Sequence, residues 1–180
     1  KAKILARFFK TGKGEYGEGD IFLGIQVPDV RNVAKKYTNL EFNEVEELLR
    51  SKIHEHRLVA LLILREKFTK ANSNEREKIF NFYINNTKKI NNWDLVDLSA
   101  EYIVGSYLTN KNKSILYKLA TSTNLWEKRI SIVSTFSYIK NNQFEETFKI
   151  SEILLYDKHD LIHKAVGWML REIGKRDQNA

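Results

Sequence analysis

The sequence predicts an all-α fold, an α-α superhelix built from successive helical hairpins. Helical periodicity recurs along the 180 residues, and no segment alternates apolar and polar side chains for long enough to indicate a strand. Little after the single proline, Pro28, would break a helix. The second helices of four expected hairpins begin near residues 53, 93, 125 and 161, at intervals of about 32 to 40 residues. Such intervals are typical of HEAT and armadillo repeats. An irregular helical bundle is the alternative.

Proline, glycine and polar cap residues delimit the expected helices of the N-terminal half. A short first helix is followed by a glycine-rich loop, and proline then stands in the first turn of the second helix. Asparagine begins the third helix, and the fourth is rich in apolar residues. These helices are expected at 3–10, 28–37, 43–49 and 53–69.

Cap residues delimit the helices of the C-terminal half in the same way. Asn92 and Asn124 each precede a helix, and Glu127 would complete a capping box with Asn124. Asp160 is expected to cap the last helix, and Gly174 to end it. The helices are expected at 73–89, 93–107, 113–120, 125–140, 143–156 and 161–173.

Composition limits the class of protein. With 42% hydrophobic and 12% aromatic residues, the chain can bury a sizeable core, and we expect one domain over residues 1–180. The absence of cysteine excludes disulfides, thiolate metal sites and a cysteine nucleophile. The longest apolar run, Leu58–Leu64, is too short to span a bilayer, and the first residues do not resemble a signal peptide. We therefore expect a cytoplasmic protein.

The charge of the chain favours an anionic partner. Thirty Lys and Arg residues against 23 Asp and Glu residues give a net charge of +7, and nucleic acid is the commonest anionic partner. When the second helices of the four hairpins are aligned, one charged residue falls in the second turn of each helix. These residues are Arg57, Asp97, Arg129 and Lys164. Stacked helices would place them on one concave surface, a basic groove that contains one carboxylate.

The last helix carries a tryptophan among cations. Lys164, Trp168, Arg171 and Lys175 share one stripe of this helix. The opposite, core stripe consists of Ile162, Val166, Met169 and Ile173. An indole between cations suits a surface that binds a phosphate backbone and stacks on a ligand. The alternative is a tryptophan covered by the neighbouring repeat.

Arg129 and Asp97 are the other candidate site residues. The neighbours of Arg129 one turn away are all apolar, so its guanidinium must find an anion or a carbonyl group. It could clamp a phosphate or form an ion pair with Asp97 or Glu101. Asp97 lies one turn after Trp93, and the pair could hold a cation between ring and carboxylate. For Asp97 too, an ion pair with Arg57 or Arg129 is the alternative.

Two other motifs do not indicate a site. Gly12-x-Gly14-x-x-Gly17 resembles a dinucleotide-binding fingerprint, but it follows a helix rather than a strand. His159 and His163 have the spacing of a helical metal pair but no evident third ligand. We therefore expect no metal and no cofactor.

Five segments resemble one known family, the DNA alkylation repair enzymes of the AlkD type. The resemblance runs over nearly the whole chain and is most specific in the last three segments. The segments are Phe22-Leu23-Gly24-Ile25, Pro28-Asp29-Val30-Arg31, Asn92-Trp93-Asp94-Leu95-Val96-Asp97, Leu125-Trp126-Glu127-Lys128-Arg129-Ile130 and the run 160–174.

The resemblance implies HEAT-like repeats and a DNA glycosylase that acts in base excision repair. Members of the family remove positively charged N3- and N7-alkylated purines, such as 3-methyladenine and 7-methylguanine, from double-stranded DNA without a cofactor. The family's site residues match Asp97 as the catalytic group and Trp93, Trp168 and Arg129 as substrate-binding groups. Arg171 resembles a residue that contacts the DNA backbone.

From these patterns together we expect a monomer associated with the nucleoid. Its contacts to the DNA backbone are expected from Arg57, Lys164, Arg171 and Lys175.

Two departures from the family pattern leave other functions open. The loop from Gly12 to Asp20 suggests a divergent subfamily, and the family usually continues with further helices beyond Gly174, so we expect terminal helices to be lacking. One alternative is a non-catalytic HEAT-like module that binds DNA structures. The other is a protein-binding solenoid whose basic groove takes an acidic peptide.

Overall fold

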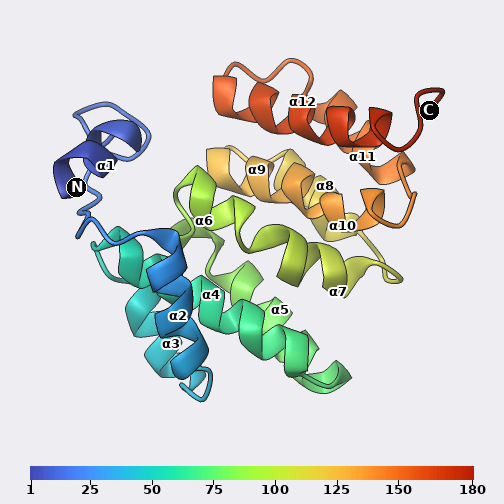
Figure 1. Cartoon of the computed structure of the whole chain (residues 1–180). Helices are drawn as coiled ribbons and strands as arrows, with labels where there is room; N and C mark the ends of the chain where they lie inside the picture. The colour runs from blue at the N-terminus through green and yellow to red at the C-terminus, as the bar shows by residue number, and fades with distance from the viewer. The chain divides into compact units, whose positions relative to one another are not determined.

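Helices account for all the regular structure of the chain, as the sequence predicts (Figure 1). The computed structural model describes residues 1–180 and divides them into two compact units, 1–95 and 96–180. Successive helices pack as pairs within each unit, which is consistent with an α-α superhelix. None of the helices combines the length and the apolar character needed to cross a bilayer.

The N-terminal unit is organised around one buried helix. The central run of α4, Leu58–Leu64, is apolar on all sides, with Leu58, Leu61 and Leu64 almost inaccessible, and such a segment must be covered by other helices. Helices α2, α3 and α5 pack against it. The elements are α1 (Ala2–Phe8), α2 (Val27–Lys36), α3 (Phe42–Leu49), α4 (His54–Lys70), α5 (Ser73–Asn85) and the short η1 (Thr87–Lys89).

A buried carboxylate fixes the segment that joins the glycine-rich loop to α2. The Glu55 side chain accepts hydrogen bonds of 2.8 to 3.2 Å from the backbone N–H groups of Leu23, Gly24 and Ile25. Gly24 has φ +91°, and a Cβ there would lie 2.7 Å from the backbone nitrogen of Ala2. Only glycine fits this close approach without strain.

The C-terminal unit consists of packed helical pairs. Helix α9 packs against both α8 and α12, and α11 packs against α12. The predicted core stripe of the last helix is confirmed, because Ile162, Val166, Met169 and Ile173 are all buried. After α6 (Trp93–Asp97), the elements are η2 (Glu101–Gly105), α7 (Ser106–Leu108), α8 (Ser114–Ala120), α9 (Leu125–Ser134), α10 (Phe136–Ile139), α11 (Glu145–Leu154) and α12 (Asp160–Gly174).

Three expected helices are interrupted. The helix expected over 73–89 ends at Asn85, and the separate 3₁₀ turn η1 follows it. The helix expected over 93–107 contains a π-helical turn, η2, where Gly105 packs directly against the backbone of Ser134 in α9. The helix expected over 125–140 is divided at Thr135, whose hydroxyl donates to the carbonyl oxygen of Ile132. The change at η2 coincides with a close approach between helices, and the break at Thr135 with a side-chain bond to the backbone of the same helix.

The caps are partly as predicted. Asn92 and Asn124 accept bonds from the first backbone N–H groups of their helices, which confirms both. The capping box with Glu127 is wrong, because the Glu127 carboxylate accepts from the hydroxyl of Ser122. The cap assigned to Asp160 is also wrong, because the preceding residue, His159, accepts the N–H of Leu161 through Nδ1.

We expect Gly105→Ala to lower the free energy of unfolding by about 1–3 kcal/mol, the usual effect of overpacking. A Cβ at this position would overlap the carbonyl oxygen of Ser134, whereas a Cβ at Gly167 in α12 would meet nothing within 4 Å. Gly167→Ala is therefore the matched control, and it should raise stability by about 0.5–1 kcal/mol. Urea unfolding followed by circular dichroism measures both. Equal stability of Gly105→Ala and wild type would show that the contact between η2 and α9 is not tight.

Candidate active site

The four predicted site residues are divided between the units. Trp93 is the first residue of α6 and belongs to the N-terminal unit. Asp97, at the end of α6, belongs to the C-terminal unit together with Arg129 of α9 and Trp168 of α12. The environment of each residue is defined within its own unit.

Asp97 and Arg129 form a two-point ion pair. Arg129 donates from Nε to Asp97 Oδ1 at 2.9 Å and from Nη2 to Oδ2 at 2.8 Å. The side chain of Arg129 is 6% exposed and that of Asp97 is 18% exposed. Both carboxylate oxygens therefore take a charge-assisted bond, and the plane of the carboxylate is fixed by the guanidinium. The ion pair that the sequence leaves open for Arg129 is the arrangement found.

A third bond ties the same guanidinium to the last helix. Arg129 Nη1 donates to the carbonyl oxygen of Leu161, in the first turn of α12, at 2.6 Å. Arg129 thereby links α6, α9 and α12. A buried guanidinium needs such acceptors, because an unpaired buried charge is strongly destabilising.

Trp168 lies on the outer side of α12, half-buried against another aromatic ring. Its ring centroid is 5.6 Å from that of Phe136. Lys140 and Arg176 lie over the face of Phe136, at 4.6 and 5.8 Å from its centroid. This cluster combines two aromatic rings with two cations within one unit, a combination suited to nucleic acid.

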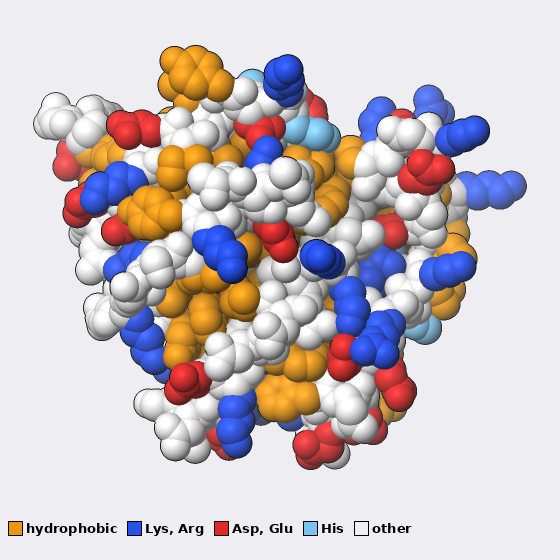
Figure 2. All heavy atoms as spheres, turned by 180° about the vertical axis from the view of Figure 1, so that it is seen from behind, with side chains coloured by type: hydrophobic (Ala, Val, Ile, Leu, Met, Phe, Trp, Pro, Cys, Tyr) orange, Lys and Arg blue, Asp and Glu red, His pale blue; other side chains and the backbone are white.

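The predicted cations beside Trp168 are exposed. Arg171 faces solvent, Lys164 pairs with Asp160 at 2.8 Å, and Lys175 pairs with Glu172 at 2.7 Å. Surface pairs of this kind are weak, so both lysines can exchange their partner for a phosphate. Figure 2 shows that Lys and Arg side chains on the visible face are mixed with Asp and Glu.

Trp93 packs on two phenylalanines of the N-terminal segment. The Phe9 ring stacks on the indole at a centroid distance of 5.0 Å and an angle of 17°, and Phe8 meets it edge-on at 5.8 Å. The sequence patterns did not predict this contact. The one feature that could have indicated it is the adjacent aromatic pair, Phe8 and Phe9, at the end of the first helix.

The same unit holds a buried charged cluster that the sequence did not indicate. The imidazole of His54 contacts Asp94 through Nε2 at 2.8 Å and Asp20 through Nδ1 at 3.2 Å. Arg57 pairs with Asp20 at 2.6 Å and donates to the carbonyl oxygen of Ser51. Asp20 ends the glycine-rich loop, so this loop is held by charge pairs.

In this cluster the pKa values of His54 and Asp20 both shift in the direction that favours the charged form. Burial works to lower the pKa of His54, but its hydrogen bonds to Asp20 and Asp94 outweigh burial and raise the pKa above 6.5. Burial works to raise the pKa of Asp20, yet the bond from His54 and the charge of Arg57 lower it overall.

Arg57 differs from its predicted position on a DNA-binding surface. The residue is 4% exposed, and its guanidinium is engaged with Asp20 and Ser51. The helical alignment placed it correctly in the first turns of α4, but it could not show that the glycine-rich loop covers it.

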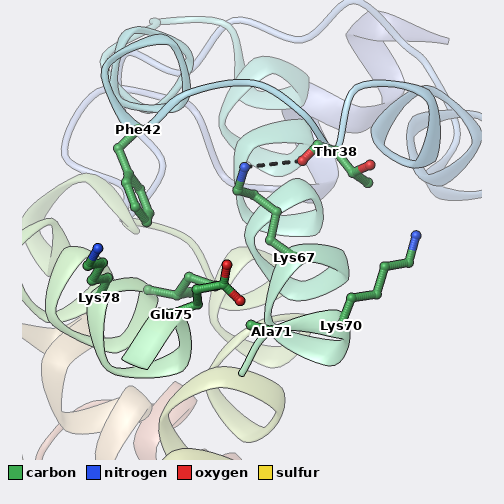
Figure 3. Close-up of a pocket in the computed structure, with 8 residues that line it drawn as sticks. Thr38, Phe42, Lys67, Lys70, Ala71, Glu75 and Lys78 are labelled. Carbon is green, nitrogen blue, oxygen red and sulfur yellow. Dashed lines mark hydrogen bonds between the residues drawn. The ribbon is translucent and has the colours of Figure 1, made fainter. Parts of the chain in front are cut away.

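A separate pocket of about 420 Å³ lies beside α4 in the N-terminal unit. Figure 3 shows Phe42 and Glu75 directed toward it and Lys70 directed away. Lys67 donates to the carbonyl oxygens of Thr38 and Leu40, and Glu75 completes the capping box of α5. Lys67 and Glu75, the main polar groups of this pocket, therefore have partners within the local structure, and neither requires a ligand.

The histidines considered as metal ligands have other roles. His159 caps α12, and His163 bonds the carbonyl oxygen of Asp157. No group of three or more His, Cys, Asp or Glu side chains is arranged to hold a metal ion.

The chain is thus all-helical, and its C-terminal unit holds a fixed carboxylate and a pair of aromatic rings. The chain belongs to the family described as DNA alkylation repair enzyme, which matches residues 1–180. The protein therefore belongs to an enzyme family and has a role in DNA alkylation repair.

The fold is shared with a solved structure from that family. It is described as "Predicted DNA alkylation repair enzyme from Enterococcus faecalis", and the TM-score is 0.70 at 15% sequence identity. The alignment covers 99% of this chain and 83% of the other. No curated protein matches the chain.

We expect Arg129→Met to lower the free energy of unfolding by about 3–5 kcal/mol, because it leaves the Asp97 carboxylate without its buried partner. Arg171→Met, at an exposed position of α12, is the matched control and should stay within about 0.5 kcal/mol of wild type. Chemical unfolding of the three proteins checks this. A loss for Arg129→Met no larger than that of the control would mean that the pair is not structural.

Proposed function

We propose that the protein is a DNA glycosylase that hydrolyses the N-glycosidic bond of cationic N3- and N7-alkylated purines in double-stranded DNA. The observation that carries this proposal is the Asp97 carboxylate, fixed at both oxygens by Arg129 yet partly exposed. The proposed substrates include 3-methyladenine and 7-methylguanine, and the product is the first intermediate of base excision repair.

The proposed reaction requires mainly a negative charge that the protein holds at a fixed position. An alkylated purine of this kind already carries a positive charge, so it is a good leaving group without protonation. As the glycosidic bond breaks, positive charge develops on the sugar. A fixed carboxylate stabilises that charge more in the transition state than in the ground state, and it can accept a proton from the attacking water.

The tryptophans supply the proposed recognition of the base. Trp93 and Trp168 are both half-buried and present partly accessible rings. The face of an indole attracts a cation, so both rings favour the alkylated, positively charged purine over a neutral one. The lesion is then selected by its charge.

Exposed cations of α12 supply the proposed contacts to the DNA backbone. Lys164, Arg171 and Lys175 are all accessible to a phosphate. Arg129 is buried, and its three hydrogen bonds go to Asp97 and Leu161, so its proposed role is to fix the Asp97 carboxylate rather than to bind a phosphate. Arg57 is not part of this proposed contact set because it is buried.

We expect Asp97→Asn to slow base release by roughly 10²–10³-fold, equivalent to about 2.7–4 kcal/mol, since it keeps the shape and removes the charge. The measurement is single-turnover release of 7-methylguanine from a duplex oligonucleotide, with EDTA present. Glu145→Gln, which removes an exposed carboxylate of α11 in the same unit, is the matched control and should react at the wild-type rate.

Two results would contradict this proposal in different ways. Release by Asp97→Asn at the wild-type rate would remove Asp97 from the reaction. A folded wild-type protein that binds DNA and releases no base would identify a non-catalytic DNA-binding module instead.

We expect DNA binding to be largely independent of sequence and strongly dependent on salt. Each of Lys164→Gln, Arg171→Gln and Lys175→Gln should reduce the slope of log affinity against log salt by about 0.9, because one phosphate contact is lost. Lys149→Gln, on the exposed side of α11, is the control and should leave the slope unchanged. Fluorescence anisotropy at several salt concentrations measures the slopes. Unchanged slopes in all three α12 variants would place the DNA elsewhere.

A further inference from the structure

His54 is a buried histidine with a carboxylate at each ring nitrogen. Its side chain is 2% exposed, with Asp94 at 2.8 Å from Nε2 and Asp20 at 3.2 Å from Nδ1. An ionised carboxylate only accepts hydrogen bonds, and a neutral imidazole has only one N–H to donate. Both contacts can therefore be hydrogen bonds only when His54 is an imidazolium.

The surrounding charges balance that imidazolium. Asp20 comes from the glycine-rich loop, Asp94 from α6 and Arg57 from α4, so two carboxylates face two cations. The nearby Glu55 carboxylate is occupied by backbone N–H groups of residues 23–25. The side chains of Phe9 and Phe22, which also pack against the imidazole, are aromatic and carry no charge. Burial of a charged group is tolerated only in such a paired arrangement.

Two connections lead from His54 to Trp93. The first is through the backbone, since Asp94 directly follows Trp93 and also accepts the N–H of Leu95 through its other oxygen. The second is a cluster of rings. The His54 ring centroid lies 4.4 Å from that of Phe22 and 5.1 Å from that of Phe9, and Phe22 stacks on Phe9 at 4.9 Å. Phe9 in turn stacks on Trp93 at 5.0 Å.

We propose that His54, as an imidazolium held between Asp20 and Asp94, is the positioning residue that orients the indole of Trp93 for a cationic base. This inference rests on the proposed function, in which Trp93 contacts the alkylated purine. Phe9 covers one face of the indole, so the base must use the opposite face or an edge. Small rotations at His54 reach the indole through the stacked rings.

The proposal predicts a pH dependence with a definite sign. Loss of the His54 proton leaves one ring nitrogen with a lone pair against a carboxylate, and that contact opens. The raised pKa of His54 in the folded protein means that the network is intact below about pH 6.5 and is lost as pH rises through the folded-state pKa. Excision should therefore weaken as pH rises through the folded-state pKa of His54.

The first measurement needs no catalysis. Nitrogen NMR of the His54 ring in the full chain, followed with pH, should show a midpoint above 6.5 and both nitrogens protonated below that midpoint. The indole N–H signal of Trp93 should shift with the same midpoint. In Asp94→Asn the new amide can donate to a neutral Nε2, so the midpoint should fall and the indole signal should no longer follow it. A His54 midpoint at or below 6.5, or an indole signal that ignores it, would overturn the proposal.

The second measurement separates a positioning role from a merely structural one. Wild-type release of 7-methylguanine should decline with pH through the His54 midpoint, and Asp94→Asn should lose that decline. His54→Gln should slow release by up to about 100-fold, the scale of a displaced site group. His56→Gln is the control from the same helix, because His56 bonds only Ser51, and it should keep the wild-type profile.

These outcomes distinguish the positioning role of His54 from the proposed glycosylase function. An active wild type whose rate is flat through the His54 midpoint refutes the positioning role and leaves the proposed function intact. A wild type that releases no base at any pH refutes the proposed function, while the NMR titration still decides whether His54 and Trp93 are coupled.

Discussion

A buried guanidinium constrains the C-terminal unit more than any other single group. Arg129 is surrounded by apolar side chains, so the fold must bring acceptors to it. Asp97 supplies two and the carbonyl oxygen of Leu161 supplies the third. The positions of α6, α9 and α12 within the unit are thus linked through one side chain. The same bonds fix the carboxylate that a glycosylase would use, so stability and site geometry share one interaction.

In the N-terminal unit, too, buried charged groups need partners, and a different set of residues supplies them. His54 and Arg57 balance Asp20 and Asp94, while Glu55 is satisfied by backbone N–H groups. This arrangement converts a glycine-rich loop, which would be mobile by composition, into a segment held on α4 and α6.

In both units a residue proposed to contact the base is supported by an aromatic neighbour. Phe9 stacks on Trp93, and Phe136 packs against Trp168. A supported ring loses less conformational entropy when a ligand binds, which suits recognition by a flat, electron-rich face. The family assignment agrees with this chemistry, since alkylated bases differ from normal ones chiefly in charge.

The sequence by itself determined the helices, most of their ends, the core stripe of α12 and the family. Periodicity, a single proline and asparagine caps are local signals, so they can be recognised without coordinates. The segments around Trp93, Asp97, Arg129 and Trp168 carried the family resemblance in the same way. Only the tertiary structure decided which partner each buried charge takes. Arg57 and Asp20, or His54 and Asp94, are far apart in the chain, and no short-range pattern encodes their pairing. The ion pair of Arg129, the π-helical turn at Gly105 and the ring cluster beside Trp93 likewise depend on tertiary contacts that only the packed chain creates.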